Sequence, residues 1–317
     1  MGEGSTNTPQ GVGHGGGRVN QLSPNHVPVL LKEAIDFLAV KRGGTYIDAT
    51  VGLGGHSYEI AKRLGAPGHL IGLDKDPAAL AIAREKLTPG KGSEDWPTIT
   101  LLQRSFAEIA KGQKQGTVDG ILADIGVSSL QLENAARGFS FQADGPLDMR
   151  MDPQSERTAE QVVNHLDERQ LADVIYEFGE ERRSRRIARA ICRSRPIRST
   201  AHLAEVISAA ARPMNSEQRR IHPATRTFQA LRIFVNRELD DLQALLTAAP
   251  RILKSGGRVV VISFHSLEDR IVKDAFREGA ANGYFSLLTK KPVTATEEES
   301  DRNPRSRSAK MRAAEKV

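Results

Sequence analysis

The fold is decided by Thr45-Tyr46-Ile47-Asp48-Ala49-Thr50-Val51-Gly52-Leu53-Gly54-Gly55-His56, at residues 45–56. The first four residues are rich in β-forming side chains, and they lead into a glycine-rich turn. An amphipathic stretch, His56 to Leu64, follows the turn. Glycines let the backbone turn tightly and approach a ligand closely, and the helix after them presents free N–H groups. This order predicts the ligand-binding start of an α/β sheet.

Further strand and helix signals alternate along the first part of the chain. Apolar runs lie at residues 69–74, 99–102 and 118–124, and Pro77 occupies the place of a first-turn helix proline. Strands that are apolar on both faces and separated by helices indicate a parallel sheet covered on both sides. The fold class is therefore predicted to be α/β.

The alternation stops near Gln131, and a series of helical patterns follows it. We predict helices at residues 159–165, 168–178, 184–194 and 200–211, then one long helix from Phe228 to Ile252 that leads into a buried strand at 258–264. The economical explanation is a helical domain inserted between the fourth and fifth strands of one sheet. The predicted divisions are a sheet domain of residues 24–134 and 228–295, and an inserted helical substrate-recognition domain of residues 135–227.

Both ends of the chain have few apolar residues. Residues 1–23 are rich in Gly, Ser, Thr, Asn and Gln, so we expect a disordered tail. Residues 296–317 change from an acidic run to a basic one, which predicts a flexible basic tail able to touch nucleic acid. The whole chain carries 45 Lys and Arg against 39 Asp and Glu, a formal charge of +6 that gives weak support for a polyanionic partner.

Length and composition favour a soluble enzyme-sized protein. The 317 residues suffice for about two domains, and 39% of them are hydrophobic. No run approaches the roughly 18 apolar residues of a membrane span, and the N-terminus lacks a secretory pattern. The single cysteine, Cys192, supplies neither a disulfide nor a multi-cysteine zinc site. We therefore expect a cytoplasmic protein without a membrane or metal; the sequence leaves a homodimer open.

Two acidic residues end predicted strands at the cofactor edge of the sheet. Asp74 lies about twenty residues after the glycine turn, where a carboxylate accepts hydrogen bonds from both ribose hydroxyls of an adenosine. The turn lacks the third glycine of a dinucleotide motif, so S-adenosylmethionine fits better than the nicotinamide cofactor of a dehydrogenase, which remains the alternative. Asp124 ends the fourth predicted strand, and it either faces the reactive end of the cofactor or caps the next turn.

Motifs across the chain resemble the bacterial 16S ribosomal RNA cytosine-N4 methyltransferase family. They include the glycine turn and lie at residues 26–31, 48–57, 124–132, 138–151, 222–232 and 263–270. The resemblance implies a Rossmann-like, seven-stranded class I methyltransferase sheet with an inserted all-helical domain. It also implies S-adenosyl-L-methionine as cofactor and the 16S rRNA or small ribosomal subunit as partner, with a cytidine of the decoding region as target.

The resemblance also assigns site residues. It implies that the cofactor is bound by Gly54, Gly55, His56, Asp74, Phe106, Asp124 and Gln131. Without the family, Phe106 reads as a core residue and His56 as a surface residue that opens a helix. Asp124 is the candidate catalytic residue, because a carboxylate that accepts a hydrogen bond from N4–H favours attack by this weakly nucleophilic amine.

One departure from many amino-group methylases lies after Asp124. Those enzymes place an aromatic residue three positions further on, where its ring stacks on the target base, and this chain has Val127 there. Phe139 and Phe141 are candidates for the stacking role, although either is equally suited to a core. The base must leave its stack to reach the cofactor, which is easiest in single-stranded or loop RNA.

Arginine is concentrated in the predicted insertion. Eight arginines lie at positions 182, 183, 185, 186, 189, 193, 195 and 198. Their planar guanidinium groups suit phosphate and base contacts, but a solvated helix face explains them equally well. Arg219, Arg220, Arg226 and Arg232 surround His222-Pro223, and we expect these four to contact RNA. The alternative to an enzyme is a ribosome-assembly factor that binds RNA and cofactor without essential catalysis.

Overall fold

The computed structural model describes residue 1 and residues 28–90, 94–211 and 222–317. Within this part of the chain, seven strands form one sheet in the order β3-β2-β1-β4-β5-β7-β6. Their bounds are Thr45–Asp48 for β1, His69–Asp74 for β2, Thr98–Gln103 for β3, Val118–Asp124 for β4, Leu253–Ser263 for β5, Phe285–Leu287 for β6 and Lys310–Lys316 for β7. Strands β1 to β5 are parallel, and β7 runs antiparallel to both β5 and β6. The α/β class and the seven-stranded sheet are thereby confirmed.

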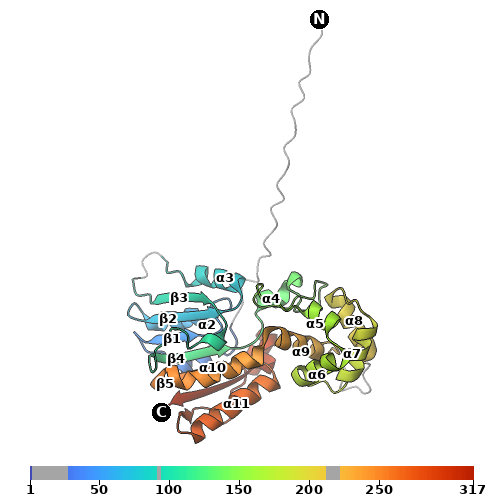
Figure 1. The fold of residues 1–317 in the computed structure, drawn as a ribbon. Helices are drawn as coiled ribbons and strands as arrows, with labels where there is room; N and C mark the ends of the chain where they lie inside the picture. Colours follow the sequence, from blue (N-terminus) through green and yellow to red (C-terminus); the bar gives the residue numbers. More distant parts are fainter. Residues whose placement is uncertain (2–27, 91–93, 212–221) are drawn as a thin grey trace.

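Helices cover both faces of the sheet (Figure 1). One face carries α1 (Leu31–Leu38) and α2 (Gly55–Leu64), and the other carries α10 (Glu238–Ile252) and α11 (Ser266–Ala281). Alternation along β1 supplies both cores, because Tyr46 packs with α1 and α2 while Ile47 packs with α10. Helix α3 (Pro77–Leu87) lies beyond α2, with Leu80 and Leu87 packed near β3. The layers leave the carboxyl ends of β1, β2 and β4 at one edge.

A second group of helices lies beside the sheet, between β4 and β5 in the chain (Figure 1). It consists of α4 (Ser129–Glu133), η2 (Ala135–Arg137), α5 (Ala159–His165), α6 (Glu168–Gly179), α7 (Ser184–Arg193), α8 (Thr200–Ala210) and α9 (Thr225–Asn236). Capping boxes begin α5 at Thr158 and α6 at Asp167, which satisfies their first backbone N–H groups. These helices share a hydrophobic core of their own that includes Ile175, Ile187 and Leu203. Residues 1–23, predicted to be a disordered tail, lie outside the described part apart from Met1.

The single helix predicted from Phe228 to Ile252 is wrong. The chain instead forms α9 and α10, separated at Arg237, whose φ of 54° is left-handed. The carbonyl of Asn236 accepts a hydrogen bond from Lys75 Nζ at 2.7 Å, and its side-chain oxygen accepts one from the Met151 N–H at 2.7 Å. These contacts hold the bend between the two helices. Since Phe228 belongs to the helical core, the boundary predicted between residues 227 and 228 falls within α9.

The flexible C-terminal tail predicted at residues 296–317 is also wrong. This segment forms α12 (Glu297–Arg302), η4 (Pro304–Ser308) and β7, and β7 lies between β5 and β6 in the sheet. Small or flexible apolar residues of β7, Met311 and Ala313 among them, are fully buried. Arg312 is neutralised by Asp269 of α11 across a distance of 2.6 Å. Four consecutive residues of β7, from 311 to 314, are therefore buried, Arg312 included, which the overall polarity of the segment concealed.

Candidate active site

A pocket opens at the carboxyl ends of β1, β2 and β4. Strands β2 and β4 flank β1 on opposite sides, so this edge is the topological switch point at which open α/β sheets bind ligands. Of the predicted site residues, the pocket is lined by Gly55, His56, Asp74, Phe106, Asp124 and Gln131. Gly54 does not line it. The pocket wall thus gathers six of the seven residues from five separate segments of the chain.

The glycine turn forms part of the pocket wall. Gly54 has a φ of 77° and precedes the first residue of α2, a left-handed conformation that other residues rarely adopt. Gly55 is needed for a different reason, because a Cβ there would lie 2.3 Å from Cγ of Pro28. Helix α2 begins at this point without a side-chain cap, so its first N–H groups face the pocket edge. Gly54 therefore shapes the turn, and Gly55 provides the close backbone approach.

Asp48 stabilises this turn through hydrogen bonds inside the protein. Its side chain accepts hydrogen bonds from Ser57 Oγ at 2.5 Å and from the Thr50 N–H at 3.1 Å, and only 1% of the residue is exposed. Burial raises the pKa of Asp48, against the effect of the Ser57 hydrogen bond. Both oxygens are thus engaged by the protein. Asp48 is a structural residue of the turn and does not line the pocket.

Asp74 lies at the end of β2, where the sequence predicts it. Its Oδ2 accepts the Gly52 N–H at 2.8 Å, and its Oδ1 accepts the Asp76 N–H at 2.8 Å. Burial raises the pKa of Asp74 to about 6, although both backbone N–H groups favour the charged form. The carboxylate is therefore fixed against the glycine turn, and its remaining lone pairs can accept ribose hydroxyls.

Asp76 is a site residue that the sequence reasoning missed. It is fully buried, caps α3 through the Ala78 N–H, and accepts hydrogen bonds from Gln131 Nε2 at 3.0 Å and Arg137 Nη1 at 2.7 Å. Asp76 thereby ties the loop after β2 to α4 and fixes Gln131 in the pocket wall. An aspartate directly before a first-turn proline is a common N-cap signal, so this position was recognisable.

Asp124 projects from the end of β4 and is the least satisfied acid in the pocket. Its buried Oδ1 has no hydrogen-bond partner among the described residues, and Oδ2 lies 3.6 Å from Nδ1 of His56. His56 Nε2 is 3.1 Å from the Val29 carbonyl, so Nε2 carries the proton and Nδ1 faces Asp124 as an acceptor. Burial raises the pKa of Asp124 to about 7 and lowers that of His56. The alternative that Asp124 caps a turn is wrong, because no N–H of the described residues bonds its carboxyl.

Arg305 is the second missed residue, and it reaches the pocket from η4. Its guanidinium donates hydrogen bonds to Ser129 Oγ at 2.9 Å and to the Val127 carbonyl. Val127 belongs to the loop that follows Asp124, and Ser129 is the first residue of α4. The sequence reasoning placed Arg305 in a flexible tail, and the charged composition of that segment gave no signal of a pocket contact.

The aromatic residues named for base stacking do not reach the pocket. Phe139 is 7% exposed within the helical core, and Phe141 packs against His222 and Phe228 with ring centroids 4.6 and 4.9 Å apart. The ring that lines the pocket beside Asp124 is Phe264, at the end of β5. A Cβ on Gly126 would lie 3.2 Å from its Cδ2, so the backbone of Gly126 packs closely against this ring.

The arginines expected near His222 have different environments. Arg219 and Arg220 lie outside the described residues, and Arg226 is exposed. Arg232 is not an RNA contact as expected: its side chain is 15% exposed and forms two hydrogen bonds of 2.8 Å with Glu238. This buried pair joins α9 to α10 and lies behind the pocket, since Glu238 is one of the lining residues.

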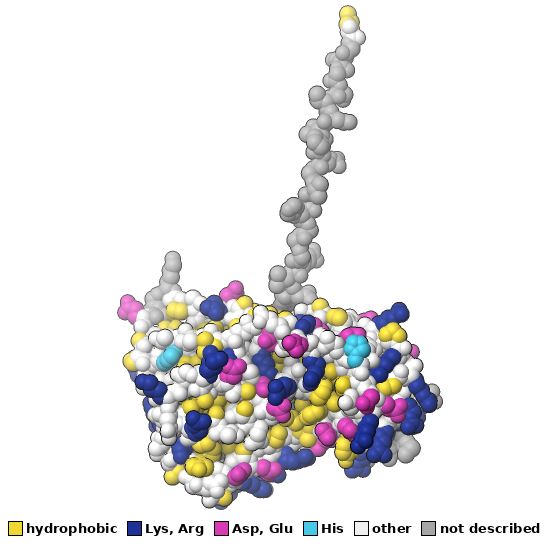
Figure 2. All heavy atoms as spheres, in the orientation of Figure 1, with side chains coloured by type: hydrophobic (Ala, Val, Ile, Leu, Met, Phe, Trp, Pro, Cys, Tyr) yellow, Lys and Arg dark blue, Asp and Glu magenta, His cyan; other side chains and the backbone are white. Residues whose placement is uncertain are grey.

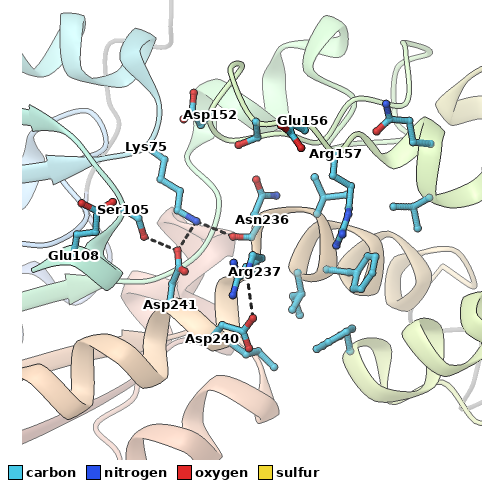
Figure 3. Close-up of a pocket in the computed structure, with 18 of the residues that line it drawn as sticks. Lys75, Ser105, Glu108, Asp152, Glu156, Arg157, Asn236, Arg237, Asp240 and Asp241 are labelled. Atoms are coloured by element: carbon cyan, nitrogen blue, oxygen red, sulfur yellow. Dashed lines mark hydrogen bonds and ion pairs between the residues drawn. The ribbon is translucent and has the colours of Figure 1, made fainter.

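A larger cleft of about 1230 Å³ adjoins the pocket between the sheet and the helical part. Figure 3 shows its charged bridge, in which Lys75 Nζ lies 2.5 Å from Asp241 Oδ2 and Ser105 Oγ donates to the same oxygen at 2.6 Å. Lys75 lines both the cleft and the pocket. The cleft wall carries five basic and five acidic side chains, so its charge is balanced.

The pocket fits S-adenosylmethionine on several observations. Gly52 and Gly55 of the glycine turn line the pocket with backbone, Asp74 offers carboxylate oxygens to ribose, and Phe106 offers an apolar ring to adenine. No third glycine provides a pyrophosphate turn. The Asp124 carboxyl, whose Oδ1 has no partner among the described residues, can accept a hydrogen bond from a substrate. Fold and site together define a methyltransferase of the α/β class.

The chain belongs to the MraW methylase family, whose model matches residues 23–317. It is 72% identical over 292 residues to the ribosomal RNA small subunit methyltransferase H of Koribacter versatilis, a match that covers 92% of this chain and 93% of that one. The protein of the same name from Acidobacterium capsulatum is 62% identical over 92% of this chain and 98% of its own. Membership confirms the resemblance and an enzyme that uses S-adenosylmethionine, and it excludes the nicotinamide dehydrogenase. No helix among the described residues is long and apolar enough to cross a membrane.

Proposed function

We propose that this methyltransferase acts on the exocyclic N4 of a cytidine in the decoding region of 16S rRNA. The observation that carries the proposal is the Asp124 carboxyl, which lines the pocket and whose buried Oδ1 has no hydrogen-bond partner among the described residues. A buried acceptor of that kind is costly unless a ligand supplies a donor. The amino group of cytosine is such a donor, and the relatives that carry the name ribosomal RNA small subunit methyltransferase H support an rRNA substrate.

The chemistry asked of the protein is positioning and proton management. The cofactor supplies a methyl group that is already activated by its bond to a positively charged sulfur. Asp124 Oδ1 accepts a hydrogen bond from N4–H, which draws the nitrogen lone pair out of the ring and toward attack. Formation of the new N–C bond would be matched by cleavage of the methyl–sulfur bond, whose electron pair would stay on sulfur; N4 loses one proton, and Asp124 receives it. With a pKa of about 7, the carboxyl can take that proton and release it to water near neutral pH.

His56 assists Asp124 without carrying charge. Its Nε2–H is held by the Val29 carbonyl, and burial lowers its pKa, so the ring stays neutral. The neutral ring lies 3.6 Å from Oδ2 of Asp124 without adding a positive charge beside the carboxyl. We assign Phe264 the stacking role for the target base, because it lines the same pocket as Asp124.

We further propose that the helical part, within residues 135–227, binds the RNA backbone through α7. Its exposed arginines are spaced to share one face, opposite to the buried Ile187 and Ile191. Arg185, Arg186, Arg189 and Arg193 belong to α7, Arg182 is exposed just before it, and Glu168 pairs with Arg189. Figure 2 shows basic side chains gathered at this end of the molecule. The charge-balanced cleft of Figure 3 is less suited to phosphates.

Mass spectrometry of small-subunit rRNA tests the function. A strain that lacks this protein should lose N4-methylation of the target cytidine, and the wild-type chain should restore it. Asp124→Ala, expressed as a folded protein, should not restore it. Unchanged N4-methylation in the deletion strain would remove the assignment. Rescue of a growth defect by the Asp124→Ala chain, with the RNA still unmethylated, would instead favour an assembly factor.

A further inference from the structure

The C-terminal segment of residues 297–308 is bound to both sides of the active-site pocket. On one side, Glu299 Oε1 accepts the Leu30 N–H at 2.7 Å, next to the residues that hold His56. On the other side, Arg305 donates to Ser129 Oγ and to the Val127 carbonyl in the loop after β4. The segment continues directly into β7, which is paired in the sheet. Its place beside the pocket is therefore set by the fold.

We propose that Arg305 is a positioning residue for methyl transfer, which fixes the loop after β4 and keeps the Asp124 carboxyl oriented and ionised for the substrate amine. This inference rests on the function proposed above. Arg305 acts through Asp124 and its loop, and the reacting nitrogen is not its partner. The residue thereby makes the C-terminal segment a component of the catalytic centre.

The hydrogen bonds give Arg305 its geometric role. Val127 and Ser129 lie three and five residues after Asp124, and Gly126, directly before Val127, has a φ of 123°. A loop with that backbone needs external support, because its glycine samples many conformations. Two donors of one planar guanidinium hold the loop and the first residue of α4 at a fixed spacing. Lysine has a single ammonium and cannot reproduce that spacing.

The charges around Asp124 give Arg305 its electrostatic role. The carboxyl is faced by His56 of α2, Glu268 of α11 and Arg305, and it acts in turn on Asp48 of β1. Burial raises the pKa of Asp124 most, Arg305 lowers it, and Glu268 raises it. The guanidinium is itself flanked by Glu133 of α4 and by Arg232 of α9. Because His56 is neutral, Arg305 is the group that favours the ionised carboxyl.

Loss of Arg305 should therefore shift the pH profile of the reaction. Without the guanidinium, the pKa of Asp124 rises further, so a smaller fraction is ionised at neutral pH. The acid limb of the single-turnover rate should move upward by about one pH unit, and part of the lost rate should return at high pH. A purely structural role would lower the rate at every pH and leave the limb in place.

Three variants separate these effects, each measured with small ribosomal subunits and saturating S-adenosylmethionine. Arg305→Met removes charge and hydrogen bonds, and we expect at least a tenfold loss at neutral pH with the shifted limb. Arg305→Lys keeps the charge, and we expect a smaller loss without the shift. The control is Arg307→Met, because Arg307 lies on the same η4, is exposed, and donates to Ser300 within the segment. Its rate should stay within about twofold of wild type.

The outcomes distinguish this inference from the function on which it rests. If the wild-type chain places no methyl group on N4, the proposed function fails. If the wild type is active and Arg305→Met keeps its rate, or loses rate at all pH values without the shifted limb, the positioning role fails alone. Cofactor affinity measured by calorimetry and thermal melting of each variant identify a misfolded protein. If Arg305→Met does not fold, Arg305→Lys and Arg305→Gln test the effect of the charge. An acid limb of the pH profile that stays in place in Arg305→Lys and moves upward in Arg305→Gln would support the electrostatic role of Arg305. An acid limb that does not move in Arg305→Gln would overturn that role.

Discussion

The rate of methyl transfer should depend on pH through Asp124. Burial raises the pKa of this carboxyl to about 7, and only its ionised form can take the proton that N4 loses. The ionised fraction is then about 0.1 at one unit below this pKa and about 0.9 at one unit above it. Between about pH 6 and about pH 8 the rate constant of the chemical step should therefore rise by about tenfold.

The assay is a single-turnover experiment with enzyme in excess over small ribosomal subunits, which isolates chemistry from product release. Saturating cofactor is required, because burial also raises the pKa of Asp74 to about 6 and protonation there should weaken binding at low pH. Asp124→Asn is the matched variant: its amide has nearly the same shape but no titration. We expect it to lose about 10² to 10⁴ in rate and to retain no dependence on pH in this range.

Two results would refute this reasoning. A flat profile in the wild type would mean that Asp124 does not titrate in the reactive complex. A tenfold rise that persists in Asp124→Asn would assign the titration to another group, and His56 would be the first to test because its Nδ1 lies 3.6 Å from Asp124 Oδ2. Equal losses of rate and of cofactor affinity in Asp124→Asn would reduce the residue to a wall of the pocket.

Three further predictions concern other parts of the site. Gly55→Ala should lower the free energy of unfolding by about 1–3 kcal/mol in urea titrations, because the new Cβ would meet Pro28; Gly90→Ala, with open space around it, is the control. Asp74→Ala should abolish S-adenosylmethionine binding in calorimetry while circular dichroism stays native, and tight residual binding would contradict a ribose role. Replacing Arg182, Arg185 and Arg186 together by Gln should weaken subunit binding at low salt and reduce the log–log salt slope by about 2 to 3, whereas an unchanged slope would leave these arginines as a solvated face.

The sequence predicted most of what depends on local pattern. Strands β1 to β4 are short apolar runs with helices between them, so periodicity and turn residues located them and also placed Asp74 and Asp124 at strand ends. Parallel order then brought those carboxyls to one edge. The capping residues Thr158 and Asp167 also depend on local sequence, because each accepts a hydrogen bond from the backbone N–H three residues further along the chain. Such features need no knowledge of what lies across the fold.

The wrong predictions involve contacts between distant segments, whereas the missed Asp76 carried a local N-cap signal. The bend at Arg237 is held by Lys75, which is more than 150 residues away, and no local signal marks it. Strand β7 combines charged residues with Met311 and Ala313, and its pairing with β5 decides which of them are buried. Phe264 and Gly126 meet only because β4 and β5 are neighbours. A sequence pattern cannot supply these pairings, since each depends on the finished sheet.

The two acids of the pocket differ in a way that separates binding from catalysis. Both oxygens of Asp74 already accept backbone N–H groups, so this carboxylate is fixed and suited to holding a ligand. Asp124 has an oxygen without a partner among the described residues, and its pKa is raised well above 3.8. Between about pH 4 and about pH 7 the unfolded chain therefore ionises this group more readily than the folded protein, so the folded state loses stability as pH rises.

An amide at position 124 would avoid that loss, and Asp124→Asn should accordingly raise the melting temperature of the cofactor-free protein above about pH 7 while leaving it unchanged below about pH 3. The sign follows from the raised pKa: the ionisation cost is absent where both states are protonated and complete where both are ionised. If Asp124→Asn is more stable than the wild type but inactive, the environment of Asp124 favours the reaction and lowers the stability of the folded state. Equal melting temperatures at high pH would show that the carboxyl is already satisfied without substrate, and the catalytic role would then have to be sought at another acceptor in the pocket.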